Sequence, residues 1–232
     1  MKFSLLSLAA IVPLAAAHFK LEYPPSRGFD EDKMPEFPCG GFPQSSNRTK
    51  LSLSADSIPV ALILGHSQTA AEVLLALGND PGDNYNITLA HTFGITGLGA
   101  FCLPSVSLKG VPLTDGLNAT VQVVTDGDNG GGLYACADVT FTSAVTSDDV
   151  SATVCKNNTG VTATPFSGAA AARNANESTA DGQAQSGAGS SSSSSSASGT
   201  AATATSKGAA APLETAAWGM MGAALIGGLA VL

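Results

Sequence analysis

The sequence is poor in tryptophan, histidine and basic side chains. Its one tryptophan, Trp218, stands near the C-terminus, so the chain before it lacks the indole rings that commonly stack on sugars. Lysine and arginine together number 10, against 18 aspartates and glutamates, and the formal net charge is −8. A chain of this charge has no broad basic footprint, which excludes nucleic acid as an expected partner.

Cysteine is also scarce, and no two of the 4 cysteines stand in the C-x-x-C spacing that often holds zinc. An even number of cysteines in an exported chain favours disulfides, here two, and the spacing leaves all three pairings open. The residues concerned are Cys39, Cys102, Cys136 and Cys155.

Residues 1–17 have the pattern of a secretory signal peptide. A basic residue, Lys2, precedes an apolar run, and small residues stand at Ala15 and Ala17. This A-x-A site predicts cleavage before His18, which then becomes the first residue of the mature chain. An N-terminal histidine offers two nitrogens to one metal ion, its α-amine and a ring nitrogen. The amine has a reference pKa of about 7.7–8.0, so a metal can displace its proton near neutrality.

The C-terminus carries a second processing pattern. Ala216–Leu232 is an apolar tail with no charge after it, preceded by a short spacer and small residues that begin at Gly208. This order predicts a GPI anchor attached at Gly208 and removal of residues 209–232. A type I membrane helix is the alternative, but such a span normally carries Lys or Arg on its cytoplasmic side. We therefore expect the extracellular face of the plasma membrane, with transfer to the cell wall left open.

Residues 159–208 are predicted to form a disordered stalk. After Phe166 the segment consists mainly of Ala, Ser, Gly and Thr, with an unbroken serine run over Ser190–Ser196. Without large apolar side chains it cannot offset the entropy of ordering. The folded part is then residues 18–158, a length suited to one domain with its own core.

Five N-x-S/T sequons also indicate export and predict N-glycosylation. They begin at Asn47, Asn86, Asn118, Asn157 and Asn176.

The folded part is expected to be all-β. Short apolar or β-favouring runs cover residues 57–64, 85–93, 119–124 and 133–142. The glycine-rich segment 126–132 suits a hairpin connection between the last two. Residues 69–77 fit a helix as well as a strand. Short strands at this spacing, together with disulfides, predict an antiparallel β-sandwich.

Only His66 and His91 can join His18 in a histidine site. His66 follows Gly65 in a polar step where a loop would expose its imidazole, whereas His91 falls inside an expected strand, so we favour His66. Two imidazoles and an amine give a nitrogen-rich site that suits Cu(II), while zinc usually takes four tetrahedral ligands. The sequence therefore predicts one Cu(II) ion.

Asp138 is the candidate oxygen ligand. Strand alternation places it on the face opposite Ala137 and Val139. Aspartate is locally disfavoured in a strand, so its presence here indicates a specific role such as metal binding. A solvated aspartate on an exposed face is the alternative. Asp126 and Asp128 lie in the glycine-rich connection and are interpreted as turn formers.

Four segments together resemble the fungal LPMO-like copper-binding proteins of the copper acquisition factor type. They are residues 18–28 (HFKLEYPPSRG), 37–41 (FPCGG), 99–104 (GAFCLP) and 134–141 (YACADVTF). The resemblance covers nearly all of residues 18–158 and implies an immunoglobulin-like β-sandwich similar to lytic polysaccharide monooxygenases. It also implies a histidine brace, in which His18, His66 and Asp138 hold the copper.

For function, the resemblance implies copper uptake and handling rather than polysaccharide cleavage. A carboxylate ligand stabilises Cu(II) and makes its reduction harder, which disfavours oxygen activation. The leading hypothesis is a non-enzymatic, GPI-anchored surface protein that captures Cu(II) and passes it to a surface reductase or transporter. A copper-dependent oxidative enzyme acting on wall polysaccharide, and a structural wall protein, are the alternatives, and cell-wall glycans remain open as partners.

Overall fold

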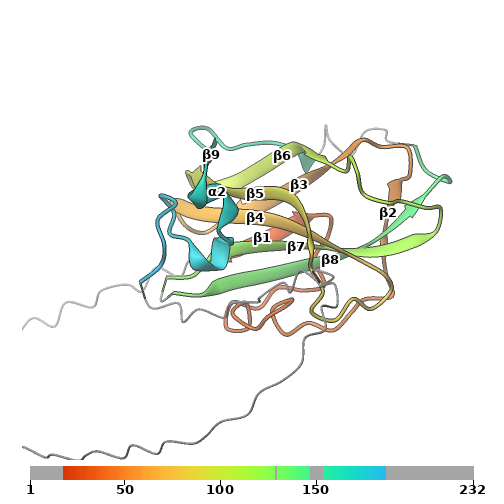
Figure 1. Ribbon diagram of the computed structural model, residues 1–232, viewed down its shortest axis with the longest axis horizontal. Coiled ribbons are helices and arrows are strands. Elements are labelled where there is room, and N and C mark those ends of the chain that lie inside the picture. The colour runs from red at the N-terminus through yellow and green to blue at the C-terminus, as the bar shows by residue number, and fades with distance from the viewer. Residues whose placement is uncertain (1–17, 129, 147–153, 187–232) are drawn as a thin grey trace, which may run out of the picture. The chain divides into compact units, whose positions relative to one another are not determined.

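The computed structural model describes residues 18–128, 130–146 and 154–186. Their regular secondary structure is almost all β-strand, as predicted, with one short helix and one 3₁₀ turn near the C-terminal end (Figure 1). The strands are β1 Phe19–Tyr23, β2 Thr49–Ser52, β3 Ser57–Leu64, β4 Gln68–Leu77, β5 Ile87–Thr96, β6 Gly99–Ser107, β7 Leu117–Asp126, β8 Gly132–Thr142 and β9 Thr162–Pro165. The helical elements are α2 Ala169–Ala172 and η1 Ala175–Glu177.

Two sheets make up the sandwich. One contains three strands in the order β1-β3-β6, and the other contains six in the order β2-β8-β7-β4-β5-β9. All pairings are antiparallel except that of β2 with β8, which is parallel. The predicted immunoglobulin-like antiparallel sandwich is thus confirmed, with one parallel edge strand added.

The hydrophobic core lies between the sheets and follows from strand alternation. On β8, Ala135, Ala137, Val139 and Phe141 all belong to the core cluster, as the period of two predicts. The predicted hairpin is also present, because β7 and β8 pair from Leu117↔Phe141 to Asp126↔Gly132.

The ambiguous segment 69–77 is a strand. It becomes β4, paired with β5 on one side and β7 on the other. Its alanines and leucines favour a helix only in isolation, whereas here both faces of the strand are buried, and a strand buried on both faces reads as a continuous apolar run.

The two predicted disulfides form and settle the pairing. Cys39 joins Cys136 across 97 residues, and Cys102 joins Cys155 across 53. The first ties a long loop, residues 24–48, to β8. The Tyr85 hydroxyl lies 3.1 Å from Cys39 Sγ and must be the donor, since a disulfide sulfur carries no hydrogen.

The outer face of the six-stranded sheet is covered rather than solvated. Gln122 and Thr120 of β7 and Glu72 of β4 point away from the core, yet all three are buried. The loop 24–48 lies against β8, because Arg27 N donates to the Cys136 carbonyl at 2.8 Å and Tyr134 N to the Met34 carbonyl at 2.9 Å. It also contacts β7, where Gln122 Nε2 donates to the Pro38 carbonyl at 2.7 Å. The C-terminal elements cover the rest, with η1 against β4, β7 and β8 and α2 against β5.

Residues 159–186 therefore differ from the prediction of a disordered stalk that starts at residue 159. β9 pairs with β5 through Phe93↔Pro165 to Thr96↔Thr162, and Ala175 is fully buried. The composition misleads because small residues suit a segment that lies flat on a sheet, where backbone and alanine contacts replace large side chains. The remaining stalk residues, 187–208, lie outside the described residues.

The predicted sequons within the described residues differ in exposure. Asn47, Asn86 and Asn157 are exposed, whereas Asn118 and Asn176 are half-buried. The signal peptide 1–17, the Gly208 anchor site and the removed tail 209–232 all lie outside the described residues. Within the ranges that the structure describes, no helix is long and apolar enough to cross a membrane.

Candidate copper site

Strand pairing brings His18 next to His66. β1 runs antiparallel to β3 with Phe19 opposite Leu64, and Gly65 N donates to the His18 carbonyl at 2.9 Å. Since His66 directly follows Gly65, the residue that cleavage would make the N-terminus lies at the same end of the sandwich as the second histidine. The structure thus places the two histidines that the sequence pairs at one end of the sandwich.

The His18 ring is held in one tautomer. Its Nε2 lies 2.9 Å from the backbone carbonyl of Glu31, in the loop 24–48. A carbonyl oxygen only accepts, so Nε2 carries the hydrogen and Nδ1 of the neutral ring keeps a bare lone pair. Nδ1 is buried and has no hydrogen-bond partner. Metal-binding histidines commonly donate their other ring N–H to a backbone carbonyl in this way, so the ring is prepared to bind through Nδ1.

His66 lies beside a carboxylate that the sequence reasoning assigned only to a turn. Its Nε2 is 3.6 Å from Asp128 Oδ1, and its side chain is 30% exposed. Asp128 belongs to the connection between β7 and β8, at the end of the sandwich where His18 and His66 lie. The nearby sequence Asp126-Gly-Asp128 could have suggested it, because an acidic turn at a hairpin end lies where residues from neighbouring strands meet.

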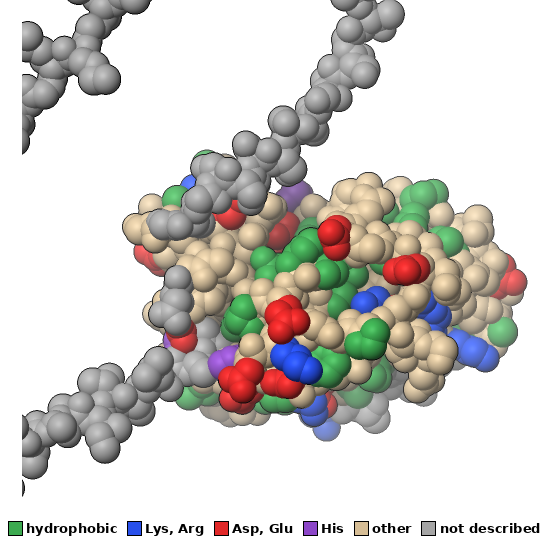
Figure 2. All heavy atoms as spheres, turned by 90° about the horizontal axis from the view of Figure 1, so that it is seen from below, with side chains coloured by type: hydrophobic (Ala, Val, Ile, Leu, Met, Phe, Trp, Pro, Cys, Tyr) green, Lys and Arg blue, Asp and Glu red, His purple; other side chains and the backbone are tan. Residues whose placement is uncertain are grey.

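Two cavities meet at this turn. One, of about 660 Å³, is lined by His66 and the other, of about 150 Å³, by His18. Both are also lined by Gly127, Asp128 and Gly130, so the turn separates them and faces both histidines. The space-filling view shows a histidine side chain next to acidic side chains, with a basic side chain among them, on one face of the domain (Figure 2). At the turn itself, the carboxylate of Asp128 beside His66 favours a cation.

Asp126 fixes the start of the same turn. Its Oδ1 accepts hydrogen bonds from Thr69 Oγ1 at 2.5 Å and from Ala70 N at 2.9 Å, which joins the end of β7 to β4. Burial raises the pKa of this carboxyl above its ordinary value, although both hydrogen bonds oppose the rise. Asp126 acts as a structural residue of the turn, as its interpretation as a turn former implies.

The structure does not bring Asp138 to the histidines. Asp138 lies 6 residues along β8 from Gly132, the strand's first residue, which at about 3.4 Å per residue places it about 20 Å from the turn. It pairs with Thr120 in the middle of the hairpin. The structure therefore does not support Asp138 as the oxygen ligand of a site that contains His18 and His66.

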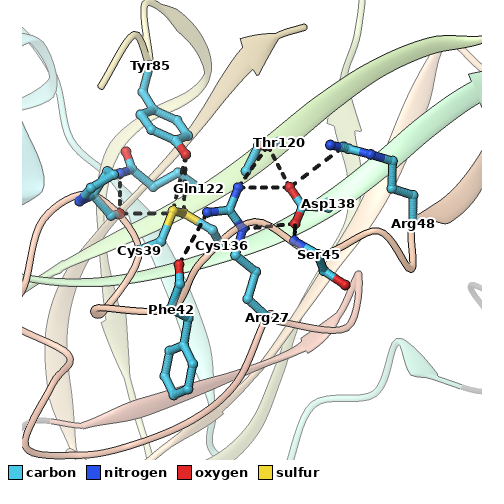
Figure 3. Close-up of a disulfide and its surroundings, with 11 residues drawn as sticks. Arg27, Cys39, Phe42, Ser45, Arg48, Tyr85, Thr120, Gln122, Cys136 and Asp138 are labelled. Atoms are coloured by element: carbon cyan, nitrogen blue, oxygen red, sulfur yellow. Dashed lines mark hydrogen bonds and ion pairs between the residues drawn. A yellow bond between two sulfur atoms is a disulfide. The ribbon is translucent and has the colours of Figure 1, made fainter. Parts of the chain in front are cut away.

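Asp138 instead forms the centre of a buried ion-pair network (Figure 3). Arg27 donates from Nε and Nη2 to its two oxygens, both at 2.9 Å, in a bidentate pair. Ser45 N and Thr120 Oγ1 donate at 2.7 and 2.8 Å, and an Arg48 nitrogen lies 3.7 Å away. The side chain of Asp138 is fully buried. The alternative of a solvated aspartate is thus also wrong.

The pKa of Asp138 reflects this network. Burial would raise it, but the hydrogen bonds from Arg27, Ser45 and Thr120 and the charge of Arg27 together hold it below its ordinary value. The carboxylate is ionised and its oxygens are engaged. Asp138, which the strand pattern suggested as a metal ligand, is instead a structural residue that links the loop 24–48 to the outer face of β8.

His91 lies apart from this end. It is exposed on β5 and borders an apolar groove of about 360 Å³ that Phe93, Phe166 and Pro165 also line. The structure therefore offers His91 no second ligand among the groove residues, and it serves as a matched control histidine.

The donor set fits a copper ion only after processing. Within the described residues, no three His, Cys, Asp or Glu side chains are grouped as a ready metal cage. His18, however, would supply two nitrogens if the chain is cleaved before it, because its backbone nitrogen would then be an amine. The unpartnered Nδ1 of His18 and the closeness of His66 to Asp128 are the observations that fit a metal here.

Comparison with known proteins shows the family to which the chain belongs. A sequence model described as copper acquisition factor BIM1-like matches residues 16–160. The chain belongs to the BIM1-like copper acquisition factor family. The match covers β1 to β8 and ends before β9, so the BIM1-like domain contains His18, His66 and the β7–β8 turn.

Individual relatives agree with this assignment. An uncharacterised protein of Aspergillus fumigatus is 60% identical over the full length of both chains. A lytic polysaccharide monooxygenase-like protein X325 of Yarrowia lipolytica is 34% identical over 74% of this chain and 66% of its own. The copper acquisition factor BIM1 of Cryptococcus neoformans var. grubii is 32% identical over 59% of this chain and 65% of its own. The chain thus spans about two thirds of the length of these last two relatives.

Proposed function

We propose that this BIM1-like protein captures one Cu(II) ion at the cell surface through a histidine brace, for copper acquisition and homeostasis. The ion is cargo rather than a resident cofactor. The donors are the α-amine and Nδ1 of His18, the imidazole of His66 and the carboxylate of Asp128, which replaces Asp138 in the ligand set expected from the sequence. The unpartnered, buried Nδ1 of His18 is the observation that carries the proposal.

The donor types favour Cu(II). Nitrogen ligands in a planar arrangement suit its tetragonal preference, and a carboxylate adds negative charge that stabilises the divalent ion. The same carboxylate disfavours reduction at the site, so the ion is retained as Cu(II) until a partner reduces it. The expected partner is therefore a surface copper reductase or transporter. We do not expect the site to cleave polysaccharide.

Export creates the site. In the precursor the nitrogen of His18 is part of a peptide bond and cannot bind a metal as an amine. Cleavage before His18 exposes it, so copper binding begins only after the chain has entered the secretory route. A GPI anchor near Gly208 would then keep the loaded protein at the plasma membrane or in the wall.

The test is copper binding by protein that begins at His18. Competition with a chromogenic chelator and EPR of the Cu(II) complex should report one tight site. His18→Ala, His66→Ala and addition of one glycine before His18 should each weaken binding by at least tenfold, whereas His91→Ala should leave it unchanged. Equal Cu(II) affinity in wild type and His18→Ala would contradict the proposal.

A polysaccharide assay separates this function from oxidative catalysis. Copper-loaded protein incubated with chitin or β-glucan and ascorbate should release no oxidised oligosaccharides above a copper-only control. Release that disappears in His18→Ala would replace copper capture by oxidative cleavage as the function of the site.

A further inference from the structure

The C-terminal segment outside the family match is built onto the copper end of the domain. The match ends at residue 160, but the structure continues through β9, α2 and η1 to Ser186. We call residues 174–186 the C-terminal clasp. It runs beside the end of β7 and β8 where their connecting turn lies (Figure 1). Thr179, Gln185 and Ser186 of the clasp line the 660 Å³ cavity together with His66 and Asp128.

Gln185 holds the turn through its side-chain amide. Its Oε1 accepts from Gly131 N at 2.6 Å, and its Nε2 donates to the Gly131 carbonyl at 3.1 Å. The amide thus pairs with both backbone groups of one residue, as a neighbouring strand would. The other Nε2 hydrogen goes to the Ser178 carbonyl at 2.7 Å, and Gln185 N donates to the Glu177 carbonyl at 2.9 Å. These two hydrogen bonds hold Gln185 in place within the clasp, so its side chain is already oriented toward the turn.

The turn needs such an outside partner. Gly127, Gly130 and Gly131 lie on either side of Asp128, and Gly130 and Gly131 have φ angles of 83° and 81°, which side-chain-bearing residues rarely adopt. Glycine has the largest backbone entropy to lose on ordering, so a turn of this composition is poorly ordered by its own contacts. Between the described residues of the turn, Gly127 N donates to the Gly131 carbonyl and Gly130 N to the Gly127 carbonyl, both at 3.1 Å.

We propose that Gln185 is a positioning residue of the copper site, which acts through the turn to hold Asp128 against the two histidines. The inference rests on the proposed copper site. It adds that the site of this chain depends on a segment beyond the family domain. A domain cut at residue 166 would keep both histidines and Asp128 and lose the clasp.

The chain offers a matched control for Gln185. Gln183 is exposed, lies in the same clasp, and takes part in hydrogen bonds through its backbone, to Thr179. Gln185→Ala should weaken Cu(II) affinity about tenfold, within the range of about 10–100-fold seen for outer-shell partners of metal ligands, and shift the EPR parameters. Gln183→Ala should change neither. Amide hydrogen exchange should show faster opening of residues 127–131 in Gln185→Ala alone.

A double-mutant cycle with Asp128→Asn separates positioning from general loosening. If Gln185 acts through Asp128, Gln185→Ala should cost little further affinity in the Asp128→Asn background. Full additivity of the two losses, or an unchanged affinity and spectrum in Gln185→Ala, overturns the inference. Wild type and His18→Ala are measured in parallel. If these two proteins have the same Cu(II) affinity, the proposed copper site itself is wrong, and this outcome is distinct from a failure of the inference about Gln185.

Discussion

Two aspartates of one hairpin, ten residues apart, have opposite environments. Asp138 is buried and bonded by Arg27, Ser45 and Thr120, whereas Asp128 lies at the hairpin end beside His66. A strand pattern can show that an aspartate faces away from the core, but it cannot show what covers that face. Arg27 and Ser45 come from a loop more than 90 residues away in sequence, so the sequence around Asp138 cannot predict them as its partners.

Asp138→Ala should destabilise the fold and spare copper binding. Removing the carboxylate leaves the buried guanidinium of Arg27 without its counter-charge, and breaking a buried ion pair in this way costs about 3–5 kcal/mol. Urea denaturation should show this loss, while the copper affinity of the protein that remains folded stays at the wild-type value. Asp128→Ala should show the reverse, weaker copper binding at nearly unchanged stability.

The pH dependence of this contribution has a definite sign. The folded-state pKa of Asp138 lies below its ordinary value. The network therefore stabilises the protein fully when the pH is above the ordinary pKa, and this stabilisation is lost as the pH falls through the folded-state pKa. Acid unfolding should therefore begin at higher pH in any variant that weakens the Arg27 pair. An Arg27→Lys variant with the wild-type acid midpoint would contradict this reading.

Among the elements, the attachment of η1 to β4 involves a buried carboxyl group. Glu72 is 5% exposed, and its Oε2 accepts from Ala175 N at 3.3 Å. Burial raises the pKa of Glu72 to about 7, and the charge of Glu177 adds to the rise against this hydrogen bond. The protonated acid is thus the form that the docked segment prefers.

Raising the pH should loosen this attachment. The folded-state pKa of about 7 exceeds the ordinary 4.5, so the stability from Glu72 is fully present below pH 4.5 and is lost as the pH rises through 7. The free energy of unfolding should fall by about 1–3 kcal/mol between pH 5 and 8, and amides of residues 169–186 should exchange faster. Glu72→Gln should flatten the profile, and Glu36→Gln, at an exposed site, should not.

The elements also show where sequence patterns suffice. The β3 run is predicted with the same bounds that the structure has, and the β7–β8 hairpin with nearly the same, because alternation and a glycine-rich turn are local properties. β4 and β9 could not be assigned in this way. Their residues take the strand state only because neighbouring strands and a covering segment bury them, and these are contacts between parts distant in sequence.

For the candidate site, the sequence predicts the histidine pair but not its supports. His18 and His66 follow from a cleavage motif and a loop position. The Glu31 carbonyl that sets the His18 tautomer, and the amide of Gln185 on the turn, depend on how two surface loops lie on the sheet. Every residue has a backbone carbonyl and every glutamine has a side-chain amide, so a sequence pattern cannot single out the ones that make these contacts.

At the scale of the whole molecule, the disulfides should affect the copper site unequally. Cys39–Cys136 ties down the loop that carries Glu31, whereas Cys102–Cys155 joins β6 to the segment before β9. Replacing either pair by alanines should cost about 2–5 kcal/mol of stability. Copper affinity, measured by chelator competition below the unfolding transition, should fall several-fold for the Cys39/Cys136 pair and stay close to wild type for the other. Equal losses would mean that the loop holds its place without the disulfide.

Ser186, the last residue before the undescribed C-terminal part, lines the cavity beside His66. Ser186 therefore lies at the rim of the cavity that we propose for copper. If a lipid anchor is attached downstream, as we propose, the segment that leads to the anchor begins at the same end of the domain as the proposed copper site. Access to the site would then depend on that segment as well as on the folded domain.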